Sequence, residues 1–174
     1  MGLFHMGRCI NFIKRIFRRK KLLLVGRGRL RVVNRRTGEL VKVTPWKEDL
    51  VLTCGKELIC QMLMDVAGYD TGLTWFAIGD DDTTPALAQT TLVSEQHREE
   101  ILESGKSRII NVLTFSTLIP AADCSFHIKE VGICGHSTAT AAADSGIFFD
   151  RWLEDEDNTA GDNDLIPDYE LTVG

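Results

Sequence analysis

Three consecutive aspartates at residues 80–82 are the first feature of the sequence that could do chemistry. Ca²⁺ and Mg²⁺ prefer several oxygen ligands, which a cluster of carboxylates in a loop can supply. A complete calcium-binding loop also needs a glycine and a more distant glutamate at fixed spacing, and neither follows here. The run is therefore interpreted as a solvated turn, and no metal ligand is predicted in it.

A second acidic cluster covers residues 154–157 together with Asp162 and Asp164. Turn-forming residues lie among these acids, so the sequence predicts an exposed loop over residues 154–164. The alternative is that the cluster meets a basic segment of an adjacent subunit, because complementary charges face each other across protein interfaces.

Two cysteine–histidine pairs could hold zinc or build a nucleophile: Cys124 with His127, and Cys134 with His136. Their spacing matches no closed structural zinc site. A cysteine nucleophile would also need a third group that orients the histidine, and a pocket around both. Neither can be found in the sequence, so these residues are not assigned a catalytic role.

Other common catalytic motifs are incomplete in this chain. Ser94 and Ser104 lack the glycine context of a nucleophile elbow. Gly26 and Gly28 lack the preceding βαβ unit and the third glycine of a dinucleotide loop. The sequence thus predicts no catalytic residue and no cofactor, and an enzyme is the least favoured class. The five cysteines, odd in number and not clustered, predict reduced thiols rather than a disulfide framework.

The charge of the chain is divided between its two parts. Residues 1–44 hold 13 lysines and arginines against one acid, whereas residues 45–174 hold 7 against 24. The whole chain carries a formal charge of −5 at pH 7. Such asymmetry predicts a basic arm on an acidic body.

The basic arm also has an apolar side. Apolar residues recur there at steps of three and four, at Ile10, Ile13, Ile16 and Phe17. This spacing predicts a short amphipathic helix over residues 10–21, with most of the cations away from the apolar side. A helix of this kind can dock on a protein partner, contact nucleic acid or lie on a membrane surface.

Trp46 is the best interface candidate outside the arm, because it follows Pro45 at the end of a predicted strand and large aromatic residues often anchor interfaces. The predicted partner-binding residues are Arg8, Ile13, Lys14, Arg15, Phe17, Arg18, Arg19, Lys20, Lys21 and Trp46.

The rest of the chain alternates between short β-rich runs and turn-rich loops. Two β-branched runs around a glycine-containing turn predict a hairpin over residues 30–44. Apolar residues at helical spacing predict an internal helix over residues 53–67, with Thr53 as its N-cap and Gly68 as its stop. Further strands are predicted over residues 73–78, 107–118, 126–134, 146–152 and 168–173.

The predicted elements define a fold class. The run at residues 107–118 has apolar residues on both of its sides, which predicts a central strand buried on two faces. Trp75 and Trp152 lie in predicted strands and are expected in the core. About seven strands separated by turns predict a mainly β fold, an antiparallel β-sandwich with one internal α-helix. The basic arm is assigned to residues 1–29 and the sandwich domain to residues 30–174.

Four segments follow one another in a recognisable order. They are the basic hairpin leading to DLVLTCGKELICQML, then TWFAIGDDDTTPALAQTTLVSE, then IKEVGICG, and last GIFFDRW with the closing YELTVG. This ordered set, which covers residues 30–174, resembles a family of small structural proteins of tailed bacteriophages, the tail-fibre or tail-associated proteins. The aspartates at residues 80–82 depart from the family's glycine- and threonine-rich loop, and residues 1–29 match no part of it.

The resemblance implies a non-enzymatic structural protein of a tailed-phage virion, assembled in the host cytoplasm, in the tail, baseplate or fibre-attachment region. Its implied partners are copies of itself, as a homo-oligomer, and other phage structural proteins, with no small-molecule substrate. The basic arm would bind an acidic protein surface or nucleic acid. Two alternatives stay open: a capsid decoration or vertex protein, and a nucleic-acid or membrane-surface binding module led by residues 8–36.

Overall fold

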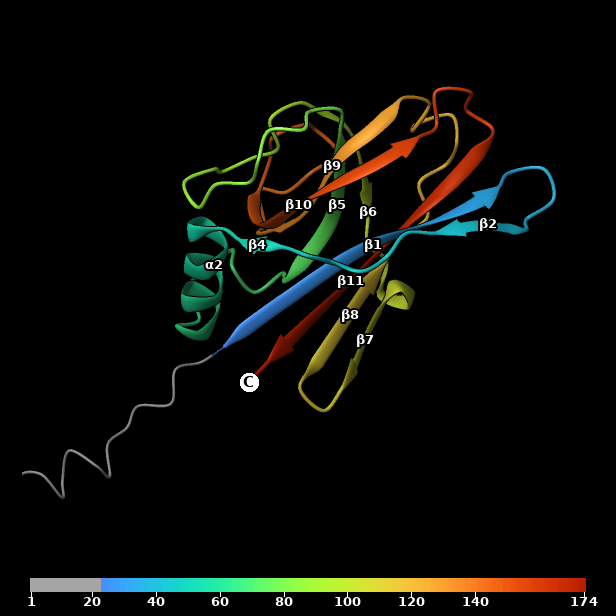
Figure 1. The fold of residues 1–174 in the computed structure, drawn as a ribbon. Helices are drawn as coiled ribbons and strands as arrows, with labels where there is room; N and C mark the ends of the chain where they lie inside the picture. The colour runs from blue at the N-terminus through green and yellow to red at the C-terminus, as the bar shows by residue number, and fades with distance from the viewer. Residues whose placement is uncertain (1–22) are drawn as a thin grey trace, which may run out of the picture.

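The computed structural model describes residues 23–174, which form two antiparallel sheets packed as a sandwich, with helix α2 beside one end (Figure 1). The predicted mainly β fold with an internal helix is confirmed. Within residues 23–174, no helix has the length and apolar character needed to span a membrane. In chain order the elements are β1 (Leu24–Asn34), β2 (Leu40–Val43), β3 (Lys47–Glu48), β4 (Leu50–Val51), α2 (Thr53–Leu63), β5 (Leu73–Gly79), β6 (Glu95–Glu100), the 3₁₀ turn η1 (Glu103–Gly105), β7 (Lys106–Ile109), β8 (Val112–Ser116), β9 (His127–Gly135), β10 (Ile147–Asp157) and β11 (Asn163–Val173).

The first sheet has the order β2-β1-β11-β8-β7, and β3 also pairs with β1. Strands β1 and β11 are antiparallel partners along their whole length, from Leu24 opposite Val173 to Asn34 opposite Asn163. Because side chains alternate across a strand, β1 turns Leu30 inward while its arginines face outward. The predicted hairpin over residues 30–44 is confirmed by the pairing of β1 with β2.

Strand β1 carries glycine at two inward positions where other side chains approach the backbone closely: Trp152 of the second sheet at Gly28, and Tyr169 of β11 together with Asp49 at Gly26. A Cβ at Gly28 would overlap the indole ring of Trp152, and a Cβ at Gly26 would overlap the Tyr169 hydroxyl and the Asp49 carboxylate. These two glycines therefore serve packing. The predicted domain boundary at residue 30 is wrong, because residues 24–29 pair with β11 and belong to the sandwich.

The second sheet has the order β4-β10-β9-β5-β6 and supplies much of the core. Trp152 is buried, stacks on Tyr169 with ring centroids 5.9 Å apart, and meets Phe76 edge-on at 6.4 Å. Burying one large apolar side chain such as Phe76 contributes about 1.5–3 kcal/mol. The predicted core position of Trp152 is confirmed, whereas Trp75 is half-buried and packs against a smaller cluster.

Helix α2 packs on the second sheet through Gly55 and Leu58, which are its buried residues. A Cβ at Gly55 would overlap the Phe149 carbonyl, so the glycine allows the helix to approach β10. The helix begins at Thr53, as predicted. However, the N-cap position is held by Leu52 without a side-chain hydrogen bond, so the predicted capping role of Thr53 is wrong.

The helix ends at Leu63, earlier than the predicted residue 67. Asp65 takes a left-handed backbone with φ of 55°, and the Val66 N–H donates back to the Gln61 carbonyl at 3.1 Å. This is a common way to close the last turn of a helix. Gly68, the predicted stop, has φ of 91° and lies in the loop that follows.

The predicted long strand over residues 107–118 is instead the hairpin of β7 and β8, which pair antiparallel. The chain reverses at Ile110, whose φ is 55°. The hairpin lies at the edge of the first sheet, so the expectation of a central strand buried on two faces is wrong. The apolar residues on both sides of this segment do not mean that both sides are buried, because the isoleucine at the turn, Ile110, is 84% exposed.

The predicted loop over residues 154–164 is also wrong, because β10 extends to Asp157 and β11 begins at Asn163. Glu154 and Glu156 face inward and are mostly buried. The Lys47 ammonium lies 2.8 Å from a Glu154 carboxylate oxygen, and the Lys42 ammonium lies 2.5 Å from a Glu156 oxygen. Lysines of the same chain thus neutralise part of the acidic run and allow it to continue as a strand.

Candidate interaction surfaces

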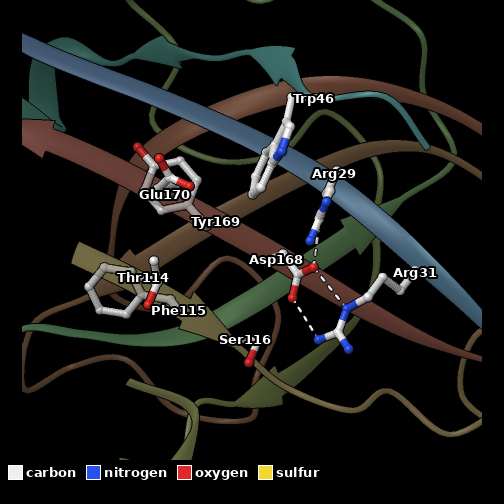
Figure 2. Close-up of a pocket in the computed structure, with 9 residues that line it drawn as sticks. All are labelled: Arg29, Arg31, Trp46, Thr114, Phe115, Ser116, Asp168, Tyr169 and Glu170. Atoms are coloured by element: carbon white, nitrogen blue, oxygen red, sulfur yellow. Dashed lines mark hydrogen bonds and ion pairs between the residues drawn. The ribbon is translucent and has the colours of Figure 1, made fainter. Parts of the chain in front are cut away.

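Trp46 lies on the outer face of the first sheet, beside Arg29 of β1 (Figure 2). The guanidinium carbons of Arg27 and Arg29 are 4.7 and 4.3 Å from the centroid of its ring. Each such cation–π contact contributes about 0.5–1 kcal/mol at an exposed site. Both contacts hold the indole against β1, so Trp46 is a fixed part of this face.

A hollow of about 300 Å³ lies beside Trp46, between the arginines of β1 and the hydroxyls of β8 (Figure 2). Arg31 donates two hydrogen bonds to the Asp168 carboxylate, at 2.8 and 2.7 Å, and Arg29 donates a third at 3.0 Å. Arg27 pairs with Glu170 at 2.8 Å. The carboxylates of β11 therefore neutralise much of the positive charge of this part of the chain.

A groove of about 450 Å³ lies between α2 and the ends of β1, β8 and β11; we call it the α2 groove. Lys106 is its charged lining residue, and the Lys106 ammonium pairs with Glu103 at 2.7 Å. The helix contributes Ile59, Met62 and Leu63, which follow one another at helical spacing beside its buried face. The apolar lining includes Leu24, Leu58, Leu63, Phe115, Phe149 and Val173.

Exposed apolar side chains lie around the α2 groove. Leu63 on its wall is 78% exposed, and Met64 next to it is 71% exposed. The turn of the β7–β8 hairpin, the start of β1 and the C-terminus lie toward the same end of the molecule (Figure 1). Exposed apolar patches of this kind mark surfaces that bind a partner.

Glu130, in the Glu-Val-Gly strand, forms a fully buried ion pair with Arg151. The Arg151 Nε donates to a Glu130 oxygen at 2.6 Å, and the N–H groups of Val93 and Ser94 donate to the same carboxylate at 3.1 and 2.7 Å. Arg151 also donates to the Thr83 carbonyl at 2.7 Å. This network fastens the long loop between β5 and β6 to the second sheet.

A second buried ion pair holds the loop between β9 and β10. Arg98 pairs with Glu95 at 2.6 Å, and both side chains are almost completely buried. Arg98 also donates to the carbonyls of Thr140 and Ser145, at 3.1 and 3.0 Å. Both buried ion pairs thus bind loops of their own chain and contribute to a rigid fold.

Asp150, Asp49 and Tyr169 form a third polar cluster beneath β1. The Tyr169 hydroxyl donates to Asp49 at 2.7 Å, while neither carboxyl oxygen of the fully buried Asp150 has a hydrogen-bond partner. Burial, and next the negative charge of Asp49, raise the pKa of Asp150 well above its ordinary range. Asp150 therefore stays protonated at pH values where an exposed aspartate is ionised.

Replacing Asp150 by asparagine is expected to stabilise the protein increasingly as the pH rises. The pKa of Asp150 is raised in the folded state. Its contribution to the free energy of unfolding is therefore complete below its ordinary pKa of 3.8 and is lost as the pH rises through the raised value. Asparagine does not ionise. We therefore expect the melting temperature of Asp150→Asn to increase relative to that of the unchanged protein between about pH 4 and pH 8, measured by calorimetry.

The exposed Asp123 provides a matched control, since Asp123→Asn removes a carboxylate that water already solvates. Its melting temperature should follow that of the unchanged protein at every pH. A difference between Asp150→Asn and the unchanged protein that does not vary with pH would contradict a raised pKa at Asp150.

The cysteine–histidine pairs considered from the sequence do not come together as a metal or catalytic site. The Cys124 thiol faces the Pro120 carbonyl at 3.2 Å, whereas His127 pairs with Asp155 at 2.7 Å on the surface. Burial raises the pKa of Cys134 to about 12, which keeps this thiol protonated at neutral pH. Residues 23–174 contain no group of three or more histidines, cysteines, aspartates or glutamates placed to hold a metal ion.

The aspartates at residues 80–82 turn to separate partners. Gln96 donates to Asp80 at 3.1 Å, the Thr83 N–H donates to Asp81 at 2.7 Å, and Lys129 lies 3.5 Å from Asp82. The Thr83 hydrogen bonds lower the pKa of the exposed Asp81. This arrangement agrees with the predicted turn.

Of the predicted partner-binding residues, the structure describes only Trp46. Its contacts with two arginines agree with a position at the surface. Arg8, Ile13, Lys14, Arg15, Phe17, Arg18, Arg19, Lys20 and Lys21 lie outside the described residues. Sequence reasoning missed the α2 groove, whose lining comes from segments at opposite ends of the chain.

Comparisons of this chain with protein-family models, with curated proteins and with solved structures find no match.

Proposed function

We propose that this chain is a non-enzymatic structural subunit of a tailed-bacteriophage particle, in the tail, baseplate or fibre-attachment region. It acts by packing against copies of itself and against other phage structural proteins. The placement in a phage particle comes from the four ordered segments that resemble tail-associated proteins. The proposed mode of action comes from the surface of the sandwich.

The observation that carries this mode of action is the α2 groove. Its lining is apolar apart from Lys106, and its wall includes the strongly exposed Leu63. An apolar side chain gains about 25 cal/mol for each Å² that a partner removes from water. Interfaces between permanently associated subunits are accordingly more apolar than other protein surfaces.

The charged groups of the sandwich support a structural role. The pairs Glu130–Arg151 and Glu95–Arg98 bind loops to the second sheet. On the outer face of the first sheet, Arg29 and Arg31 share Asp168. These arginines belong to the stretch that the sequence offered for nucleic-acid binding, and their ion pairs compete with phosphate contacts.

The oligomeric mass of the full chain in solution tests the proposed self-assembly. We expect a defined oligomer by light scattering, and we expect Leu63→Glu to shift the mass toward the monomer, because a buried charge at an apolar contact is unfavourable. The matched control is Leu102→Glu, which adds the same charge at an exposed leucine outside the groove lining. A full chain that stays monomeric at all concentrations would contradict self-assembly.

A further inference from the structure

We infer that the α2 groove of one subunit receives residues 10–17 of a second copy of this chain, an inference that rests on the proposed self-assembly. The groove and the segment match in chemistry. The segment carries Ile10, Ile13, Ile16 and Phe17 at steps of three and four, so a helix presents them on one side. An amphipathic helix that lays such a stripe into an apolar groove is a common form of recognition.

Strand β1 begins at the wall of the α2 groove. Leu24, the first residue of β1, is part of the groove wall. The Leu23 N–H donates to the Gly174 carbonyl at 2.8 Å, and the Gly174 N–H donates to the Leu23 carbonyl at 2.9 Å. Residues 1–22 are therefore attached at the end of the sandwich where the groove opens.

The short connection between the arm and β1 favours a groove on another subunit. The predicted helix over residues 10–21 leaves only Leu22 before Leu23, and Leu23 is held by its pairing with Gly174. Folding the helix back onto its own groove would need a reversal at this one residue. A tethered segment has a high effective concentration at a site of its own subunit only if the connection is long enough to reach that site. This connection is short, so the groove of a neighbour is the better fit.

Charge complementarity agrees with this arrangement. Residues 1–22 hold seven lysines and arginines and no acid, whereas residues 45–174 hold 24 acids against 7 lysines and arginines. With the apolar side of the helix in a neighbour's groove, its cations face outward, onto a body in which acids exceed lysines and arginines. Complementary charges of this kind direct subunits to the correct register.

Photo-crosslinking in the full chain tests the inference. Phe17 is replaced by photoreactive benzoylphenylalanine, and this protein is mixed with a heavy-nitrogen-labelled chain that carries no photoreactive group. Mass spectrometry of the digested adducts then shows which residues are joined and whether they come from one copy or two. The matched control places the same group at Asn11, which belongs to the same segment but is not three or four residues from any member of the apolar stripe.

We expect adducts that join position 17 of one copy to α2 or to the Val173 end of β11 in the other copy, with far fewer from position 11. Leu63→Glu in the labelled copy should lower the yield of adducts between copies about tenfold, because losing one buried apolar contact weakens the affinity about tenfold. Leu102→Glu in the labelled copy should leave the yield unchanged.

Adducts within a single copy, adducts outside the groove, or equal yields from positions 11 and 17 would overturn the inference. If the chain is still an oligomer by light scattering in these cases, self-assembly stands and only the assigned contact falls. A monomer without adducts between copies removes both the inference and the proposed self-assembly.

Discussion

Replacing Glu130 by alanine is expected to lower the free energy of unfolding by about 3–5 kcal/mol, because it leaves the buried Arg151 without its counter-ion. Both side chains of this pair are fully buried. The variant also leaves the Val93 and Ser94 N–H groups without their acceptor. Chemical denaturation followed by tryptophan fluorescence measures the change, and the loop between β5 and β6 should become more accessible to proteases.

The control for Glu130 is the exposed ion pair made by the next residue of the same strand. Lys129 pairs with Asp82 at 3.5 Å, and the Asp82 side chain is 78% exposed. Exposed pairs contribute little because water solvates both charges. Asp82→Ala should therefore leave the denaturation midpoint unchanged. A Glu130→Ala variant as stable as Asp82→Ala would contradict the assignment of Glu130 as the centre of the buried network.

Replacing Gly28 by valine is expected to prevent the two sheets from closing and to cost about 3 kcal/mol or more, at the upper end of overpacking effects. A side chain at this position would overlap the indole ring of Trp152. That ring is itself fixed between Tyr169 and Phe76, so it cannot move away. Circular dichroism in the near ultraviolet reports the packing of Trp152 and should lose its signal, together with a fall in melting temperature.

Gly38 provides the comparison for Gly28. It lies in the turn between β1 and β2 with φ of 72°, and a side chain there would meet no other atom within 4 Å. Asparagine tolerates this left-handed backbone better than most residues. Gly38→Asn should therefore melt close to the unchanged protein. A Gly28→Val variant with unchanged melting and near-ultraviolet signal would show that β1 does not lie against Trp152.

Local patterns were sufficient to predict the fold class. The alternation in residues 168–173 reports which side of a strand is buried, and β11 follows it, whereas β9, although a strand as predicted, is buried on both sides from Glu130 to Gly135. The spacing of Leu58 and Met62 likewise reports a helix. These features depend on neighbours in sequence, which is why they can be read without the structure.

Several of the errors come from contacts between residues far apart in sequence, and one comes from a turn with a weak local signal. Glu154 and Glu156 were expected in a loop because their segment is acidic and rich in turn-forming residues, but Lys47 and Lys42 neutralise them from across the sandwich. The turn at Ile110 has no glycine or proline, and Asn111 alone does not interrupt the apolar pattern of residues 107–118. Gly28 is explained only by Trp152, at the other end of the chain.

The candidate surfaces were predicted only in part. Trp46 was selected for its position after Pro45, and the structure places it on the outer face of the first sheet. The α2 groove could not be predicted, since Leu24, Leu63 and Val173 meet only when the sandwich has formed. The apolar spacing predicted the helix but not that Met62 and Leu63 would lie at the surface.

The most direct test of the central claim is to look for this chain in particles produced from the genome that encodes it. Mass spectrometry of purified particles should find it in stoichiometric amounts, and a particle reconstruction should place its α2 end against a neighbouring subunit in the tail, baseplate or fibre-attachment region. A position on the capsid shell would support the decoration or vertex alternative instead. Complete absence of the chain from intact particles would contradict a structural role in the virion.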